Sequence, residues 1–398
     1  MNKVYLDNSA TTKVSESVME AMKPYFTDIF GNPSSIHSFG QEARSAVDKA
    51  RQALAEFLNC DPTEVIFTSG GTESDNLAIK GVVDQYYKDV IPDNVLPHII
   101  TTAFEHHAVL NTVKDLEKQG RIEATYILPN EDGVIDVKDI ENAIIENTVL
   151  VSVMYVNNET GVIQPISEIG KLVRIKNQEP RIKNPIVFHT DAVQSAEFCL
   201  MDVKELGVDL LTLTAHKIHG PKGIGALYVK KGVPIKAQMT GGDQEFRVRA
   251  GTENLAAVAG LAAALAEVKS RMSKVKSIES LRDKLETELT NRISNSIING
   301  KNALRAPHIS NISFINAEGE AIILNLDMEG IAVSSGSACT SGSLEPSHVL
   351  TSMGIPAAQA HGSIRFSLSR ETTVEEIDQV IEILPGIIDK LRAMSPIK

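Results

Sequence analysis

Short apolar runs alternate with longer segments of helical spacing along most of the chain. Apolar residues recur three or four positions apart at Ala43, Val47, Ala50 and Leu54, which predicts a helix over residues 40–58. Continuous apolar runs are typical of interior strands in a parallel sheet, and they predict an α/β fold. The expected strands are Val65–Thr68, His98–Thr102, Thr148–Val156, Ile186–His189, Leu210–Leu213 and Ala226–Val229.

The C-terminal third has a different pattern. Leu255–Ile293 has long helical spacing, short strands are expected at Ile309–Phe314, Ala332–Ser334 and Ser363–Ser367, and Thr373–Lys398 is helical. A chain of 398 residues is too long for one core, so two domains are expected. We predict a large domain over residues 15–260. Residues 1–14 and 261–398 would form a smaller one that carries a loop at about 333–346.

Composition limits the classes of partner. The formal net charge of −12 argues against nucleic acid and anionic membranes, which select basic surfaces. No apolar run is long enough to span a bilayer and no signal peptide is recognisable, so a cytoplasmic protein is expected. The cysteines Cys60, Cys199 and Cys339 form no CxxC pair, which fits a reducing compartment.

A lysine follows the strand expected at Leu210–Leu213. The strand leads into Thr214, His216 and Lys217, and a glycine-rich turn comes next. Taken alone, Lys217 is an ordinary surface lysine in a turn. A Schiff-base enzyme, however, needs an amine held where desolvation and nearby cations lower its pKa, and a strand end is such a place.

An acid ends the apolar run before it. Asp191 follows that run, and pyridoxal phosphate needs an aspartate against its ring nitrogen to keep the ring protonated as an electron sink. In open α/β sheets, ligands bind at the carboxyl ends of parallel strands. Four strand ends are therefore expected to converge on one crevice, and they carry Gly71 and Thr72; Asn158; Asp191 and Gln194; and Thr214, His216 and Lys217.

The turn after Val65–Thr68 is rich in glycine. A strand, a Gly-Gly turn and a helix start bring free N–H groups and a positive dipole end to one spot, which is typical of a phosphate site, although an ordinary turn has the same residues. The sequence lacks the GK[ST] of a nucleotide-binding loop. His106 and His107 are adjacent and point in different directions, so a shared zinc ion is not expected.

From Tyr5–Thr12 to Ser363–Ser367 the chain resembles the cysteine desulfurases of the NifS/IscS group, which are pyridoxal phosphate enzymes of fold type I. TSGGTES at 68–74 and SSGSAC at 334–339 match motifs of that group. The resemblance implies a large domain with a mainly parallel seven-stranded sheet flanked by helices, and a smaller α+β domain. It implies that the cofactor is bound by Gly71, Thr72, His106, Asn158, Asp191, Gln194, Thr214, His216, Lys217 and Thr252.

Individual roles follow from the same resemblance. Gly71 and Thr72 would hold the phosphate, and His106 would stack on the ring and move protons. Gln194 would donate to the ring oxygen, and Asn158 would contact the cofactor or the substrate carboxylate. The usual GGxxERGxRSGT motif here has Phe246-Arg247 in place of Arg-Gly, so no role is carried over for its first arginine. Thr252 would reach the phosphate in the partner subunit, which implies a homodimer.

Cys339 lies in a small, polar, glycine-laced segment that predicts a mobile loop. A thiol on such a loop can reach a substrate sulfur and carry it away as a persulfide. Cys60 and Cys199 are predicted to be inert core residues. No resident metal is expected, although Cys339 would be able to ligate a transferred iron–sulfur cluster transiently.

Arg365 stands in an apolar strand pattern, where a guanidinium is costly unless it grips a carboxylate or forms an internal salt bridge. The resemblance implies that Arg365, with Asn158, holds the substrate carboxylate.

The expected reaction converts L-cysteine to L-alanine. Lys217 takes the Cα proton, Cys339 collects the sulfur, and an iron–sulfur scaffold or another acceptor receives it. The alternatives are a selenocysteine lyase or another pyridoxal phosphate β-cleaving enzyme, a transaminase, and a non-catalytic assembly or regulatory partner with the same fold. The sequence does not distinguish nitrogenase, general iron–sulfur and tRNA-thiolation acceptors.

Overall fold

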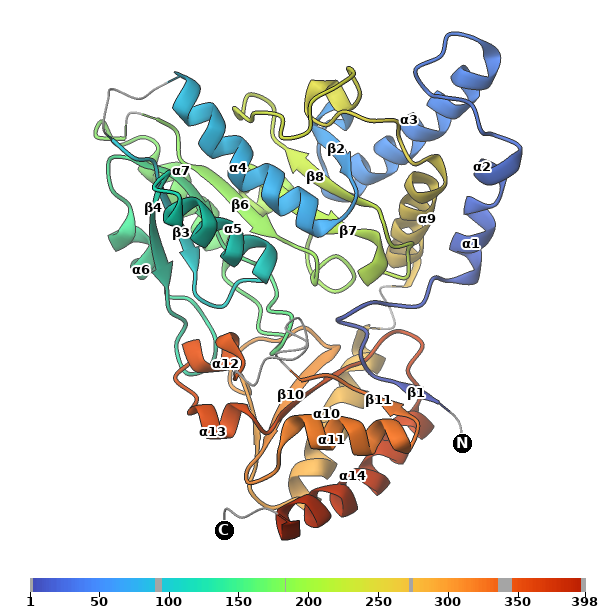
Figure 1. Cartoon of the computed structure of the whole chain (residues 1–398), viewed down its shortest axis with the longest axis vertical. Coiled ribbons are helices and arrows are strands. Elements are labelled where there is room, and N and C mark those ends of the chain that lie inside the picture. Colours follow the sequence, from blue (N-terminus) through green and yellow to red (C-terminus); the bar gives the residue numbers. More distant parts are fainter. Residues whose placement is uncertain (1–2, 90–94, 183, 272–274, 336–345, 395–398) are drawn as a thin grey trace.

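The computed structural model describes residues 3–89, 95–182, 184–271, 275–335 and 346–394. Figure 1 shows a large α/β part, with a smaller part that contains both termini beneath it. The helices are α1 Glu16–Met22, α2 Pro24–Thr27, α3 Ser38–Leu58, α4 Gly71–Asp89, α5 His107–Lys118, α6 Val137–Ala143, α7 Ile166–Lys176, α8 Val203–Leu206, α9 Leu255–Arg271, α10 Val275–Arg292, α11 Gly319–Met328, α12 His348–Ser352, α13 Ala357–Ala360 and α14 Val374–Met394. Three short 3-10 helices are η1 Pro62–Glu64, η2 Ala215–Lys217 and η3 Glu245–Arg247.

A seven-stranded sheet forms the centre of the large part, as predicted. Its strand order is β2-β8-β7-β6-β5-β3-β4, and β8 alone runs antiparallel to its neighbours. The strands are β2 Val65–Thr68, β3 His98–Thr102, β4 Glu123–Ile127, β5 Thr148–Ser152, β6 Val187–Asp191, β7 Leu210–Thr214 and β8 Gly225–Val229. The parallel strands β7, β6, β5 and β3 therefore end at one edge of the sheet.

Both faces of this sheet are covered, because its strands are apolar on both sides. Neighbouring residues of β2 point to opposite faces: Phe67 packs in a cluster with residues of α3, α7 and α9, whereas Ile66 packs with α4 and α5. Two helical layers thus shield the sheet, and the strand ends remain the open edge.

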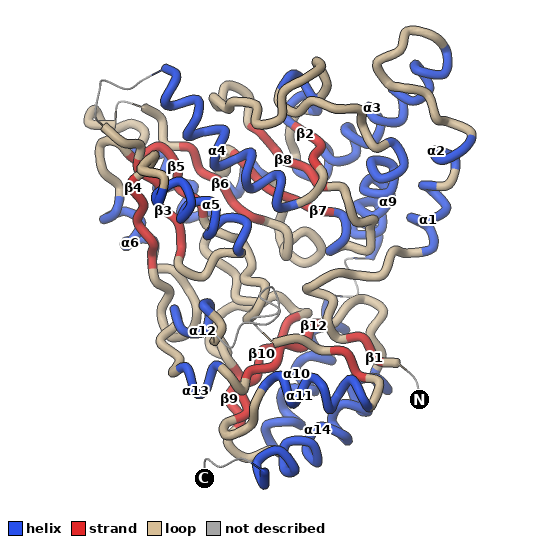
Figure 2. The backbone as a smooth tube through the Cα atoms, viewed as in Figure 1, coloured by secondary structure: helices blue, strands red, loops and turns tan. Residues whose placement is uncertain are grey.

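The smaller part has its own apolar cluster, built from helices α10, α11 and α14 and two small sheets. One sheet is antiparallel, in the order β12 Ser363–Ser367, β10 Ile309–Phe314 and β9 Ser296–Ile298. The other pairs β1 Val4–Tyr5 with β11 Ile331–Ala332, so the N-terminal arm lies beside the C-terminal third (Figure 2). The domain boundaries at 15–260 and 261–398 remain a prediction.

Several expected element bounds differ from the structure. The run at Thr148–Val156 is a strand only to Ser152, because the following residues turn toward the cavity described below. The strand expected at Ala332–Ser334 is instead Ile331–Ala332, since it pairs in register with β1. No helix was expected at Lys217, but the structure has a single 3-10 turn there.

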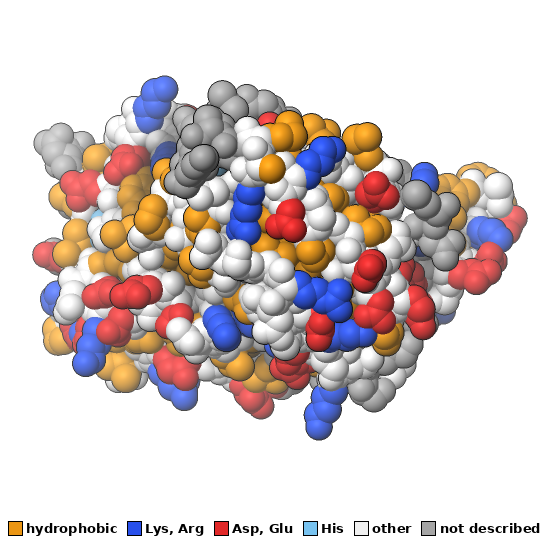
Figure 3. Space-filling model, turned by 90° about the horizontal axis from the view of Figure 1, so that it is seen from below, with side chains coloured by type: hydrophobic (Ala, Val, Ile, Leu, Met, Phe, Trp, Pro, Cys, Tyr) orange, Lys and Arg blue, Asp and Glu red, His pale blue; other side chains and the backbone are white. Residues whose placement is uncertain are grey.

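Acidic and basic side chains are mixed over the end of the molecule where α14 lies. Figure 3 views that end and shows Lys and Arg interspersed with Asp and Glu. Within the described ranges, the helices include none that is both long and apolar enough to cross a bilayer.

Three successive residues near the sheet have left-handed backbone. Glu245, Phe246 and Arg247 have φ of 46°, 55° and 68°. Glu245 is held there because its carboxylate is buried against Arg51. Such backbone is costly for residues other than glycine. Phe246 and Arg247 stand where the motif has Arg-Gly. Arg247 therefore occupies a position where the backbone favours a glycine.

Replacing Arg247 by glycine should therefore stabilise the protein, by about 1 kcal/mol, because the left-handed strain is relieved. The Arg247 side chain is exposed, and so is Asp243, with which it forms an ion pair. The midpoint of urea unfolding measures the effect. Asn316→Gly is the control, since asparagine already tolerates its φ of 62°. A loss of stability in Arg247→Gly would contradict the strain argument.

Candidate active site

A cavity of about 300 Å³ opens at the carboxyl ends of the parallel strands. It is lined by nine of the residues predicted to bind the cofactor, together with Arg365. They come from α4, the turns after β3 and β5, β6 and its following turn, β7, η2 and β12. These nine are Gly71, Thr72, His106, Asn158, Asp191, Gln194, Thr214, His216 and Lys217.

Lys217 is held by the N-terminal arm. Its Nζ donates to the backbone carbonyls of Ser9 and Ala10, the second at 2.9 Å. Gln194 Nε2 donates to the same Ser9 carbonyl, at 2.9 Å. The amine therefore lies at the cavity wall, where main-chain oxygens orient it.

The same arm reaches the turn that carries the lysine and the strand that carries Arg365. Thr12 N donates to the His216 carbonyl at 2.8 Å, and Asn8 Nδ2 donates to the Ser367 carbonyl at 2.9 Å. One short segment thus links Lys217 to β12.

Asp191 is the last residue of β6 and is buried. Its Oδ1 accepts from Val193 N at 2.9 Å. Burial raises the pKa of Asp191, while this hydrogen bond and the charge of Lys217 act in the opposite direction. A cationic ring nitrogen bound against Asp191 would favour the ionised carboxylate in the same way as Lys217 does.

Two histidines border the cavity in the neutral form. Burial first, and then the charge of Lys217, lowers the pKa of His106 and of His216 to about 4 in each case. His106 Nδ1 accepts from Ala108 N at 3.1 Å and caps α5. The proton of the neutral His106 ring is therefore on Nε2. His216 Nδ1 lies 3.2 Å from Thr11 Oγ1.

The N-terminus of α4 supplies the predicted phosphate site. Gly71 begins the helix directly after β2, and the first-turn N–H groups of a helix have no intrahelical partner. Ser69 N donates to Glu73 Oε2 at 2.9 Å, and Arg249 Nε donates to Glu73 Oε1 at 2.8 Å. Glu73 and Arg249 brace the turn, and the dipole of α4 leaves it suited to an anion.

Arg365 enters the cavity from β12. Its Nη2 pairs with Asp7 Oδ1 at 2.8 Å, and its Nη1 donates to the Asn158 carbonyl at 3.1 Å. Among the described residues, its buried Nε has no hydrogen-bond partner. The internal salt bridge considered for Arg365 is thus present, and one donor is left for a further acceptor.

Not every predicted site residue lines the cavity. Thr252 is exposed. Cys339 lies outside the described residues. Cys60 and Cys199 are only partly buried, not core residues as predicted, because both lie at the margin of an apolar cluster. Burial raises the pKa of both thiols to about 12, which keeps them in the unreactive thiol form.

Sequence patterns missed several groups at the cavity. Ser9 and Ala10 contribute carbonyl oxygens, which no side-chain pattern signals. Asp75 lines the cavity one turn into α4. Glu105 is fully buried beside it, and its burial raises the pKa of the carboxyl to about 8. The sequence signal for Asp75 and Glu105 was weak: each is an acid next to residues already predicted to bind the cofactor.

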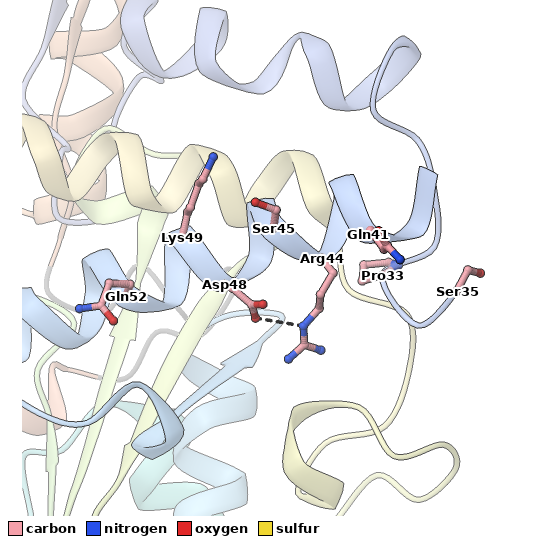
Figure 4. A pocket seen from close by; sticks show the side chains of 8 residues that line it. All are labelled: Pro33, Ser35, Gln41, Arg44, Ser45, Asp48, Lys49 and Gln52. Atoms are coloured by element: carbon pink, nitrogen blue, oxygen red, sulfur yellow. Dashed lines mark ion pairs between the residues drawn. The ribbon is translucent and has the colours of Figure 1, made fainter. Parts of the chain in front are cut away.

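A wider hollow of about 620 Å³ lies on the outer side of α3. Figure 4 shows its side chains along that helix, with Arg44 paired to Asp48. Most of them are exposed polar groups, and none of the predicted site residues is among them. The smaller cavity at the strand ends is the better candidate because it brings buried acids, an amine and a guanidinium together.

Comparisons with known proteins agree with this geometry. Residues 4–380 match the family described as aminotransferase class-V. The cysteine desulfurase IscS of Clostridium botulinum is 48% identical over 401 residues, which cover 100% of this chain and 97% of that protein.

Solved structures agree as well. A NifS-like protein superposes with a TM-score of 0.89 at 36% identity, covering 98% of this chain and 100% of that one. SspA in complex with cysteine has a TM-score of 0.79 at 35% identity, covering 94% of this chain and 100% of the other.

Proposed function

Because the chain belongs to the aminotransferase class-V family, and within it to the cysteine desulfurases of the NifS/IscS group, we propose that it converts L-cysteine to L-alanine with pyridoxal 5′-phosphate as cofactor and leaves the sulfur on Cys339. The observation that carries the proposal is the single cavity that Lys217, Asp191, His106 and Arg365 line together.

The donor set of the cavity fits the cofactor. An anion suits the first turn of α4 at Gly71 and Thr72, and the buried carboxylate of Asp191 suits a protonated ring nitrogen. The neutral ring of His106 suits stacking, and its Nε2–H is a donor. Bound there, pyridoxal phosphate would supply an electron sink for an amino acid joined to it. Asn158, Gln194, Thr214 and His216 would complete the site.

Lys217 would hold and move the proton. The carbonyls of Ser9 and Ala10 fix its amine at the cavity wall. From this position the amine would take the Cα proton of the substrate. The Nε2–H of neutral His106 would donate nearby, since its Nδ1 already accepts from Ala108 N. The buried carboxylate of Asp191 would keep the opposite side of the site negative.

Arg365 would bind the substrate carboxylate. Its buried Nε has no acceptor among the residues that the structure describes. A buried donor without an acceptor is costly, so an incoming carboxylate oxygen would relieve that cost. The side chain is already fixed by Asp7 and the Asn158 carbonyl, so little rotamer freedom remains to be lost on binding.

Cys339 would act as the sulfur acceptor. Its thiolate would attack the substrate sulfur, the Cβ–Sγ bond of cysteine would break, and the sulfur would remain on Cys339 as a persulfide. Protonation of the remaining fragment gives alanine. We propose an iron–sulfur scaffold or another acceptor in the cytoplasm as the destination of the sulfur.

A second copy of the chain is the proposed partner in a homodimer. Four large apolar side chains are exposed near α2 and the start of α3: Phe26 66%, Phe30 64%, Ile36 91% and Phe39 53%. Phe30 and Phe39 lie 5.6 Å apart, so they form a patch and are not scattered residues. The exposed position of Thr252 also supports its proposed role toward the partner's cofactor.

The test is to incubate the protein with cysteine in the absence of reductant and to weigh its peptides. We expect the peptide that contains Cys339 to gain the mass of one sulfur, and Cys339→Ser to show no such gain. Alanine formed without a persulfide at Cys339 would contradict the assignment. Turnover of selenocysteine with cysteine inert would instead favour a selenocysteine lyase.

A further inference from the structure

Asp75 is a buried acid that the proposed reaction does not use. It lies in the first turns of α4, lines the cavity and is 1% exposed. One of its carboxyl oxygens, Oδ1, is buried and has no hydrogen-bond partner in the described part of the chain. The Thr212 side chain on β7 lies close enough to the carboxyl group of Asp75 to lower its pKa, against the larger effect of burial. A half-satisfied buried carboxyl group needs an explanation, because burial disfavours an unpaired charge.

An ion pair with His189 is the first explanation to consider. His189 Nε2 lies 3.6 Å from Asp75 Oδ1, which is too long for a hydrogen bond. Both ring nitrogens have hydroxyl neighbours instead, Ser152 Oγ at 2.8 Å from Nδ1 and Thr212 Oγ1 at 3.1 Å from Nε2. His189 is fully buried, which lowers its pKa to about 3, so the ring is neutral.

The neutral ring carries one proton, so one of its nitrogens donates and the other accepts. If the single hydroxyl proton of Thr212 turns toward Asp75, Thr212 Oγ1 accepts from His189 Nε2–H. Ser152 then donates to His189 Nδ1. In that arrangement the chain of donors runs toward Asp75 and ends there, and no donor among the described residues reaches Oδ1. A proton on Oδ1 would make that atom a donor.

The surrounding charges also favour an uncharged Asp75. Asp75, His106 and Asp191 each have a polar atom within 4.8 Å of the others, and Glu105 adds a third buried acid. Asp191 and Glu105 both disfavour ionisation of Asp75, and its own burial does so most strongly. His106 and His189 are neutral, and Lys217 acts on Asp191. Two adjacent carboxyl groups that share one cation cannot both ionise.

We propose that Asp75 is a positioning residue for the cofactor, an uncharged carboxylic acid that directs its Oδ1–H toward Asp191 and leaves Asp191 as the single negative charge opposite the ring nitrogen. This inference rests on the proposed cofactor. A hydrogen bond from Asp75 would orient the Asp191 carboxylate, and a second ionised carboxylate at this place would repel it.

Infrared spectroscopy tests the protonation state directly. A protonated carboxyl group has a stretching band that an ionised one lacks and that shifts in heavy water. We expect Asp75→Asn to remove one such band at neutral pH, and Glu105→Gln to remove a different one as the matched control. If Asp75→Asn leaves every protonated-carboxyl band in place, Asp75 is ionised and the proposal is overturned.

Cofactor affinity tests the positioning role, by equilibrium dialysis of pyridoxal phosphate on variants whose thermal unfolding is first checked. Asparagine keeps an N–H donor, so Asp75→Asn should bind within about threefold of the unaltered protein, whereas Asp75→Leu should bind about tenfold more weakly. Asp191→Asn should lose at least as much as Asp75→Leu. A loss in Asp75→Asn equal to that in Asp191→Asn would show that the charge of Asp75 matters and would overturn the proposal.

The two proposals fail in different ways. An unaltered protein that takes up no pyridoxal phosphate would overturn the proposed function, and this is measured before any variant is compared. The infrared bands do not require the cofactor, so they decide the charge of Asp75 in either case.

Discussion

Lys217→Ala is expected to lower the rate of alanine formation from cysteine by at least about a thousandfold, because the group that takes the Cα proton is removed. The variant should still bind pyridoxal phosphate, since Gly71, Thr72 and Asp191 are intact. A small primary amine added to the solution should restore part of the activity, because the cavity of about 300 Å³ gains the space of the lost side chain.

Lys222→Ala is the control. Lys222 is an exposed lysine in the same glycine-rich turn and does not line the cavity. It should keep its activity within about threefold, as is usual for a surface change. Unchanged cysteine turnover in Lys217→Ala would contradict the mechanism.

Arg51→Ala is expected to lower the free energy of unfolding by about 3–5 kcal/mol, because it leaves the buried carboxylate of Glu245 unpaired. Arg51 is 4% exposed and Glu245 5%. Two hydrogen bonds join them, at 2.6 and 2.8 Å, and Glu245 also accepts from Phe67 N at 2.8 Å. The guanidinium lies over the rings of Phe67 and Phe246, which adds to its contacts.

Arg44→Ala is the matched control on the same helix. The side chains of Arg44 and Asp48 are 46% and 55% exposed, so this pair is screened by water and its loss should cost no more than about 0.5 kcal/mol. Urea unfolding of the two variants measures the difference. A cost for Arg51→Ala as small as that for Arg44→Ala would contradict the view that burial makes the first pair important.

The sheet could be predicted from the sequence because its strands are continuous apolar runs with polar residues at their ends. Local composition alone was enough to predict a strand at Leu210–Leu213 and another at Val65–Thr68. The same rule placed Asp191 and Lys217 at strand ends, and parallel strands bring such ends to one edge. The end of β5 was predicted too late, because the apolar run continues beyond the point where the backbone turns away.

The remaining features depend on contacts between distant segments. The Arg51–Glu245 pair joins residues that are far apart in the chain, and no local pattern indicates it. Asp75 lies just beyond the TSGGTES motif and drew no prediction, because its burial beside Asp191 follows from how α4 packs on β6 and β7. Ser9 and Ala10 act through main-chain oxygens, which are the same in every residue.

The N-terminal arm has one more consequence. Its Asp7 pairs with Arg365, and two and three residues later the carbonyls of Ser9 and Ala10 accept from Lys217. Lys217, proposed to act at the substrate Cα, and Arg365, proposed to bind its carboxylate, both contact this single stretch of main chain. The stretch serves as a spacer between them. A movement of the two parts of the molecule relative to each other would therefore shift both anchor points together with that spacer.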